Sequence, residues 1–190
     1  MILVIDTSSP SVATVATIPT IEGEATRELS TGRFDPGLVK ELVRSETLSK
    51  VAVASGPGSF TGLRVGVSFG LGLAMGLRIP IVPLPTLDIQ AARSDDPVTA
   101  VVDAGRGRYY FQVPGEPARL GEPAGIPSSH DLVGNVADRR SLVAAGHLFK
   151  PGEELRPFVE AAEILLRTAP EVPYRNLEIE YMQSFSSPKP

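Results

Sequence analysis

The sequence predicts an α/β protein in which helices cover a mixed β-sheet. Strand-like and helix-like patterns alternate along the first half of the chain, which is typical of this class. A strand–turn–strand pattern at the N-terminus is repeated near residue 98, and one helical segment, 61–77, is apolar on almost every side. A helix of that kind must be covered on more than one side. A hydrophobic content of 42% in 190 residues is enough for the core that such a fold needs.

The chain opens with a predicted β-hairpin. Residues 2–6 and 12–18 are rich in β-branched side chains, and the turn-forming sequence Thr7-Ser8-Ser9-Pro10 separates them. A third strand is predicted at about 24–29. These three segments would form one side of the first sheet.

A helix is predicted to begin at Pro36. Asp35 is a suitable N-cap, and proline is favoured at the first helical position, so we expect the helix to continue to about residue 44. Apolar runs bounded by turn or capping residues predict the elements that follow: a strand at 50–54, a helix at 61–77, a strand at 79–82, and a short helix at 87–93 capped by Thr86.

The opening pattern returns in the second half of the chain. Val101-Val102-Asp103-Ala104 matches Val4-Ile5-Asp6-Thr7, and the turn Gly105-Arg106-Gly107-Arg108 leads into a strand-like run at 109–113. Two lobes that begin with the same unit are therefore expected. We place an N-terminal lobe at 1–97 and a smaller C-terminal lobe at 98–190, with 184–190 frayed. The remaining predicted segments are a loop at 114–129, a strand near 142–145 and a helix at 157–168.

Charge and composition exclude several classes of protein. With 22 acidic and 18 basic residues the net charge is -4, whereas a free-standing nucleic-acid binder usually carries a basic surface. If this protein serves RNA, we expect a partner to supply most of the positive surface. The absence of cysteine excludes disulfides, thiolate catalysis and cysteine-held zinc. The N-terminus lacks the pattern of a signal peptide, and the apolar run at 65–77 is shorter than the roughly 20 residues of a membrane span. A soluble, cytoplasmic protein without membrane contact is predicted.

The glycine-rich segment 56–62, with the sequence GPGSFTG, lies between a predicted strand and a predicted helix. That is where a helix N-terminus can hold a phosphate. However, there is no lysine between residues 51 and 97 for a Walker A loop, and the dinucleotide pattern requires glycine where Thr61 stands. A nucleophile elbow would require glycine at Pro57. A tight turn that opens the helix is the favoured interpretation, and a phosphate loop is the alternative.

The helix at 61–77 carries small residues along one ridge. The ridge is formed at four-residue spacing by Gly62, Gly66, Gly70 and Ala74, and the neighbouring apolar ridge by Val65, Phe69, Leu73 and Leu77. Each interior glycine costs about 1 kcal/mol of helix stability relative to alanine. Close approach of another backbone would offset that loss. We expect a second helix to supply it, either the one that carries Leu38 and Leu42 or a helix of another protein. The alternative is an ordinary core helix.

These residues resemble the TsaB (YeaZ) family, which takes part in making threonylcarbamoyladenosine in tRNA. The most specific match is the segment 55–66, SGPGSFTGLRVG, supported by Asp6-Thr7-Ser8, by Leu84-Pro85-Thr86-Leu87 and by Asp103-Ala104-Gly105-Arg106-Gly107. The resemblance covers residues 1 to about 112 and implies an actin-like, sugar-kinase-like (RNase H-like) fold of two lobes with mixed sheets. The second lobe is reduced, since the second half is shorter than is usual for the family.

The resemblance also implies a function. Such a protein is a non-catalytic scaffold or activating subunit, required for transfer of the threonylcarbamoyl group to adenosine 37 of tRNAs that read codons beginning with A. It would act by binding the catalytic paralogue TsaD, with further contact to the ATPase TsaE, and would form a homodimer in their absence. Contact with tRNA would come through the complex. The expected partner-binding residues are Leu38, Leu42, Gly62, Val65, Gly66, Phe69, Gly70 and Leu73.

No catalytic residue and no protein-held metal is predicted. The catalytic paralogue holds a metal with two histidines four residues apart, whereas His130 and His147 of this chain are far apart and have no motif around them. We expect both to be surface or loop histidines. No H-E-x-x-H sequence is present, so a glycoprotease-like peptidase is the less favoured alternative.

Four residues at predicted strand ends are candidates for nucleotide or phosphate contact: Asp6, Thr7, Ser8 and Asp103. Actin-fold ATPases hold a metal nucleotide at these places, and Mg²⁺ needs only one or two protein carboxylates. ATP or ADP with Mg²⁺ is therefore the candidate cofactor, and an actin-fold ATPase or sugar kinase is the alternative function. The favoured interpretation is structural, because aspartates also cap hairpin turns through bonds to the backbone.

Overall fold

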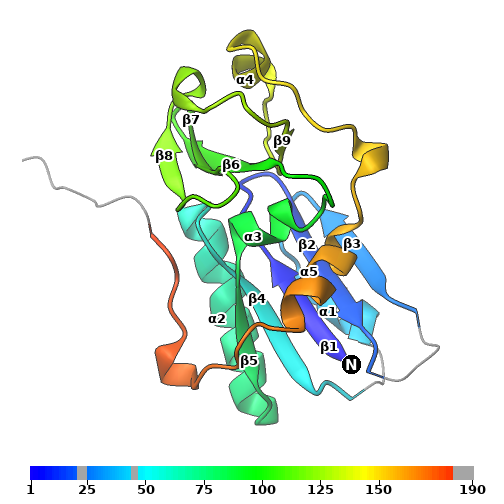
Figure 1. Ribbon diagram of the computed structural model, residues 1–190. Coiled ribbons are helices and arrows are strands. Elements are labelled where there is room, and N and C mark those ends of the chain that lie inside the picture. The colour runs from blue at the N-terminus through cyan, green and yellow to red at the C-terminus, as the bar shows by residue number, and fades with distance from the viewer. Residues whose placement is uncertain (21–24, 44–46, 182–190) are drawn as a thin grey trace, which may run out of the picture.

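The computed structural model describes residues 1–20, 25–43 and 47–181 and contains two mixed β-sheets (Figure 1). The five-stranded sheet has the order β3-β2-β1-β4-β5 and the four-stranded sheet the order β8-β7-β6-β9. The strands of the first sheet are β1 (Ile2–Asp6), β2 (Ala13–Ile18), β3 (Arg27–Thr31), β4 (Lys50–Gly56) and β5 (Ile81–Pro85). Those of the second are β6 (Thr99–Gly105), β7 (Arg108–Gln112), β8 (Arg119–Gly121) and β9 (Leu132–Val133).

Helices cover both faces of the first sheet. The helices of the described residues are α1 (Pro36–Val43), α2 (Phe60–Leu77), α3 (Thr86–Ala91), α4 (Arg140–Ala144) and α5 (Phe158–Leu166), with single 3₁₀ turns at Pro123–Gly125, Gly152–Glu154 and Tyr174–Asn176. Successive side chains of a strand point to opposite faces. Leu3 and Ile5 therefore pack with α1 and α2, whereas Val4 packs with α3 and α5. This accounts for a sheet whose β1, β2 and β4 residues are almost all buried.

The second sheet repeats the topology of the first. In each, an antiparallel hairpin (β1–β2 or β6–β7) is extended on one side by an antiparallel strand and on the other by a parallel strand. The order β8-β7-β6-β9 thus corresponds to β3-β2-β1-β4. The predicted repetition of a strand–turn–strand unit is confirmed.

The end of the described chain returns to the first sheet. Figure 1 shows the path from α4 back to α5, which packs on the face formed by Val4 and its neighbours. Beyond α5, Val172 pairs with Ile81, and the backbone N–H of Glu180 donates to Ser55 O at 2.8 Å. The division into 1–97 and 98–190 stays a prediction. Segments within 158–181, which this division assigns to the second lobe, contact the first sheet.

The secondary-structure predictions are confirmed for most of the first half. Asp35 does cap α1, since its Oδ1 accepts from the N–H of Gly37 at 2.8 Å. β3 and β5 each lie two to three residues later than predicted. Thr86 does not cap α3: Pro85 occupies the N-cap position, and Thr86 is the first helical residue.

Two predictions in the second half are wrong. Residues 140–144 form a helix where a strand was expected, and the predicted loop at 114–129 contains the strand β8. β8 is a three-residue edge strand that pairs with β7. So short a strand is defined by this pairing, and its own sequence did not predict it. The predicted fraying of 184–190 lies outside the described residues.

Replacing Tyr174 by phenylalanine tests how firmly the returning segment is attached. The hydroxyl oxygen of Tyr174 lies 2.8 Å from Ile79 O and 3.2 Å from Ala74 O, so its single hydrogen is shared between a carbonyl in the last turn of α2 and one just after the helix. Removing this donor leaves both carbonyl groups without it, so we expect Tyr174→Phe to lower the free energy of unfolding by about 1–2 kcal/mol in denaturant titrations. Tyr181→Phe is the matched control, because Tyr181 accepts its hydrogen bond from Arg64 on the exposed surface. Equal losses in the two variants would contradict this role.

Candidate functional site

The small-residue ridge of α2 faces the protein's own sheet. A Cβ added at Gly62 or Gly66 would overlap Thr7, and one added at Gly70 would overlap Val53. Gly66, Gly70 and Ala74 are buried. The close backbone approach that offsets the cost of these glycines is therefore made by β1, its following loop and β4. That Gly62, Gly66 and Gly70 bind a partner stays a prediction; in this structure Gly66 and Gly70 are buried against the sheet, and Gly62 is partly buried.

The N-terminus of α2 is attached to the loop that follows β1. Thr7 Oγ1 donates to Gly62 O at 2.7 Å, and the N–H of Ser59 donates to Ser8 O at 2.6 Å. Ser59 is the N-cap, its side chain accepting from the N–H of Gly62. A Cβ at Gly58 would come within 2.6 Å of Ser8 O. The glycine-rich segment therefore serves as a tight turn that opens a helix.

The opposite face of α2 is apolar and exposed. Only five of its 18 residues are buried. By length and composition α2 could cross a membrane, but core helices of soluble proteins pass the same test. Val65 is 44% exposed, Met75 53% and Leu77 50%. Gly72 has open space where a Cβ would be, and so does Gly76.

A groove of about 620 Å³ separates α1 from α2. Its floor includes Phe69 and Leu73, both half-buried, and its α1 side includes Val39 and Val43. We call the groove and the exposed residues Val65, Gly72, Met75, Gly76 and Leu77 the α1–α2 face. Of the predicted partner-binding residues, Val65, Phe69 and Leu73 lie on this face. Leu38 is half-buried on α1, and Leu42 is 4% exposed in the core, so Leu42 is a packing residue.

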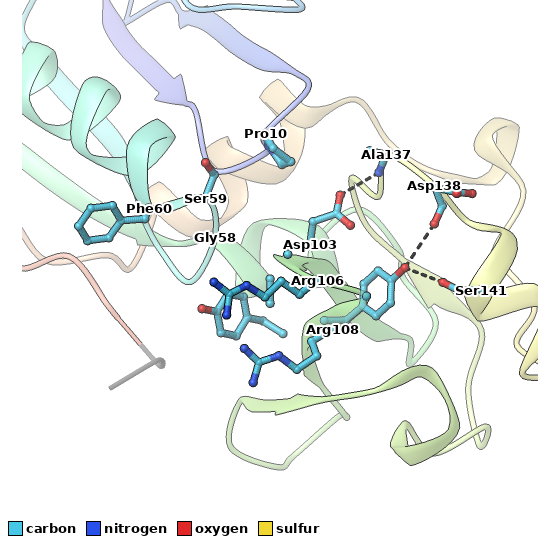
Figure 2. A pocket seen from close by; sticks show the side chains of 15 residues that line it. Pro10, Gly58, Ser59, Phe60, Asp103, Arg106, Arg108, Ala137, Asp138 and Ser141 are labelled. Atoms are coloured by element: carbon cyan, nitrogen blue, oxygen red, sulfur yellow. Dashed lines mark hydrogen bonds between the residues drawn. The ribbon is translucent and has the colours of Figure 1, made fainter. Parts of the chain in front are cut away.

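A second concave site of about 600 Å³ lies between the lobes. Pro10, Ser59 and Phe60 line it from the first lobe, and the β6–β7 turn and residues 137–141 line it from the second (Figure 2). We call it the inter-lobe cleft. Asp103, Arg106 and Arg108 are its charged residues on the hairpin, and Asp138 is the charged residue on the facing loop.

In the part of the chain that the structure describes, the lining of the cleft does not include Asp6, Thr7 or Ser8. They are 3%, 5% and 2% exposed, and Asp6 Oδ1 accepts from the N–H of Ser8 at 2.8 Å. Burial raises the pKa of the Asp6 carboxyl above its ordinary value, while the hydrogen bonds from Ser8 act in the opposite direction. Asp6 thus stabilises the turn after β1, which agrees with the favoured interpretation that this aspartate caps a hairpin turn. The predicted contact of these three residues with a nucleotide stays a prediction, and in this structure their side chains are buried.

Asp103 reaches the cleft but its carboxylate is already bonded. Its Oδ2 accepts from the N–H of Ala137 at 2.8 Å, which ties the hairpin to the facing loop. Partial burial raises the pKa of Asp103, the hydrogen bond from Ala137 lowers it, and the nearby Asp138 raises it further. A carboxylate in this position joins two segments of the second lobe.

The donor set does not fit a metal nucleotide. One of the two predicted carboxylates is buried in a turn and the other is bonded to a backbone N–H. Within the described ranges no three His, Cys, Asp or Glu side chains are grouped as metal ligands would be. His147 lies in the loop after α4, as one form of the prediction expected, and it is buried there with its Nε2 2.8 Å from Pro123 O.

Sequence reasoning missed the two cleft arginines as site residues. Arg106 and Arg108 were assigned only to a turn, although a pair of arginines between glycines at the end of a repeated strand was a visible signal. What the sequence could not give was their position opposite Phe60, because that depends on how the two lobes meet (Figure 2).

Comparison with known proteins identifies the class to which this fold and site belong. A family model described as "TsaD: tRNA N6-adenosine threonylcarbamoyltransferase" matches residues 37–150. The solved structure "YeaZ from Pseudomonas aeruginosa" superposes with a TM-score of 0.67 at 19% sequence identity, over 95% of this chain and 99% of that one. The fold is therefore the actin-like, RNase H-like α/β fold with two mixed sheets, as predicted.

Curated relatives define the family more closely. The tRNA threonylcarbamoyladenosine biosynthesis protein TsaB of Bacillus subtilis (strain 168) is 43% identical over 68 residues, 34% of this chain and 30% of that protein. The protein of the same name in Escherichia coli (strain K12) is 35% identical over 69 residues, 34% of this chain and 30% of its own length. The chain belongs to the TsaB (YeaZ) family. The matched region spans less than a third of these two relatives.

Alanine substitutions on the two sides of α2 should have opposite effects on stability. Gly62→Ala places a methyl group against the backbone of Thr7, so we expect the free energy of unfolding to fall by about 2 kcal/mol. Gly72→Ala meets open space and replaces a poor helix former, so an increase of up to about 1 kcal/mol is expected. Denaturant unfolding of both variants measures the difference. If both were destabilising by similar amounts, the assignment of the two sides would be refuted.

The buried carboxyl of Asp6 should make stability depend on pH. Because its pKa is raised above 3.8 in the folded state, the folded protein binds more protons than the unfolded chain as pH rises from 3.8 to the folded pKa. Stability from this group therefore falls across that window. Asp6→Asn keeps an oxygen acceptor for Ser8 and removes the titration. We expect the stability of Asp6→Asn relative to the natural protein to be greater at pH 7 than at pH 4. Parallel stability curves for the two proteins would contradict the assignment.

Proposed function

We propose that this protein is a non-catalytic subunit in threonylcarbamoyladenosine biosynthesis on tRNA and that it acts by binding a TsaD-type catalytic paralogue through the α1–α2 face. The observation that carries the proposal is that α2 is apolar on nearly every side while only five of its 18 residues are buried. Contiguous apolar surface on a folded protein is typical of protein–protein contact. The names of the TsaB relatives supply the pathway.

The shape of the α1–α2 face suits a helix from another protein. Gly72 and Gly76 leave the backbone of α2 accessible along one line, and Val65 and Met75 flank it with exposed apolar groups. The groove beside it exposes Phe69 and Leu73. A helix laid along this line could approach the α2 backbone closely and bury the flanking side chains. A partner helix would therefore approach α2 at Gly72 and Gly76, and not at the ridge that begins at Gly62.

The other parts of the proposal follow from the family. A TsaE-type ATPase would be a second partner, a homodimer through the same face would form in the absence of the paralogue, and tRNA modification would take place in the cytoplasm by the assembled complex. A non-catalytic role is supported by the bonds that Asp6, Asp103 and His147 make within the fold, which hold turns and loops.

Co-purification with a TsaD-type enzyme tests the proposed face. Val65→Asp places a charge on the α1–α2 face at a residue 44% exposed, so it should spare the fold and weaken the association at least 10-fold, about 1.4 kcal/mol. Val143→Asp is the matched control, because Val143 is 56% exposed on α4 of the second lobe. A reconstituted tRNA modification assay should lose activity with Val65→Asp and keep it with Val143→Asp.

Two results would reject the proposal. Undiminished binding by Val65→Asp, with unfolding midpoints of all proteins unchanged, would place the partner elsewhere. Full tRNA modification in the absence of this protein would remove the subunit role itself.

A further inference from the structure

The two connections of the chain between the lobes are bonded to each other. The first connection, 92–98, leads from α3 into β6, and the second, 151–157, leads from the second lobe back to α5. The N–H of Arg156 donates to Arg93 O at 2.9 Å, and Arg93 Nε donates to Arg156 O at 3.2 Å. Each connection therefore donates a hydrogen bond to a backbone carbonyl group of the other.

Two cationic side chains add further bonds between the connections. The guanidinium group of Arg156 donates both to Ala92 O and to the carboxylate of Asp95. Lys150, which is attached to β9 through its backbone N–H, donates from Nζ to Asp96 Oδ2 at 2.7 Å. The bonds cross from one connection to the other at several points. We call this set the inter-lobe clamp, which consists of Arg93, Asp95, Asp96, Lys150 and Arg156.

The cations of the inter-lobe clamp are largely buried, whereas its carboxylates are exposed. The side chains of Lys150 and Arg156 are 10% and 19% exposed, and those of Asp95 and Asp96 are 92% and 75% exposed. Packing already restricts the two long cationic side chains, so they lose little further conformational entropy when they pair. Hydrogen bonds and ion pairs of this kind also have a preferred geometry. The clamp therefore favours one relative position of the two connections.

An apolar contact also joins the lobes. On α3, Leu87 and Ala91 pack with residues of the second sheet, namely Ala100, Val102 and Tyr110. Hydrophobic contact is non-directional, and several of these side chains are small. The apolar contact therefore holds the lobes together without fixing the angle between them, and the directional bonds of the clamp decide that angle.

The inter-lobe clamp and the inter-lobe cleft lie at opposite ends of β6. The clamp precedes Thr99, where β6 begins, and the cleft is lined by the turn at its other end, near Gly105. A strand advances about 3.3 Å per residue, so the seven residues of β6 separate the two places by roughly 20 Å. Over that length, turning the second lobe by about 10° at the clamp would move the β6–β7 turn by roughly 3–4 Å.

We propose that the inter-lobe clamp is a conformational lock, which holds the two lobes at one angle and thereby fixes the width of the inter-lobe cleft. Weakening its ion pairs frees the second lobe to turn about α3. Because the lock is electrostatic, ionic strength controls it. This goes beyond the proposed function, since it concerns the angle between the lobes and not the α1–α2 face.

Distances between two spin labels on the full-length protein test the lock, measured by double electron–electron resonance. The chain contains no cysteine, so Thr61→Cys on α2 and Ala144→Cys on α4 give one exposed label in each lobe. We expect a single narrow distance distribution at about 0.1 M salt. Asp95→Ala combined with Asp96→Ala should at least double its width. Raising the salt to about 1 M should widen the distribution of the unaltered clamp, because the screening length falls from about 10 Å to about 3 Å.

The matched control is Glu116→Ala combined with Glu163→Ala. These changes remove two exposed carboxylates from ion pairs with Arg119 and Arg167, each of which lies within one lobe. The control should keep the narrow distribution at low salt. If the control widens as much as the clamp variant, the effect comes from the loss of charge in general and the proposal is overturned.

A second variant separates the geometry of the clamp from its charge. Arg156→Lys keeps the charge but loses the planar fork that reaches Ala92 O and Asp95 together, so it should widen the distribution by an intermediate amount. The unfolding midpoint of the Asp95→Ala, Asp96→Ala protein should stay nearly unchanged, since exposed ion pairs contribute little to stability. The lock is rejected if the unaltered protein already shows a broad distribution at low salt or if the clamp variant stays narrow. It is also rejected if widening appears only together with a lowered unfolding midpoint.

Discussion

The contact between α2 and the β1 loop holds the first lobe together. Three glycines bring the helix backbone against Thr7 and Val53, and Thr7 Oγ1 donates to Gly62 O at the point of closest approach. Since a helix with several interior glycines is intrinsically weak, this close packing is what makes α2 stable. The turn at Gly58 and the N-cap at Ser59 lie at the same contact.

That contact also decides which surface is left for partners. With the small ridge buried on the sheet, the opposite side of an apolar helix is left exposed beside α1. A core helix of this composition would normally be covered on that side as well. The exposed apolar side of α2 therefore follows from the burial of its small-residue ridge on the sheet.

The inter-lobe cleft follows from the second use of the same topology. Each lobe places the end of its first strand and the following turn toward the other lobe, so Pro10 and the β6–β7 turn meet across one cavity. In the first lobe the aspartate after the strand is buried in its own turn, and in the second it is bonded to the facing loop. The repeated acidic pattern in the sequence therefore has a structural use in both copies, and the arginines of the second turn give the cleft its charge.

The sequence by itself determined the class of fold, both hairpins and the start of the long helix, because each of these depends on periodicity or capping among near neighbours. Ile2–Asp6, Pro36 and the helix after Ser59 all fall where local chemistry places them. Only the tertiary structure decided which side of α2 is buried, since the glycine ridge suits a sheet and a second helix equally well. It also decided the strand β8, which exists only through its pairing with β7, and the position of Arg106 and Arg108 opposite Phe60. These depend on contacts between residues far apart in the chain, which no local pattern specifies.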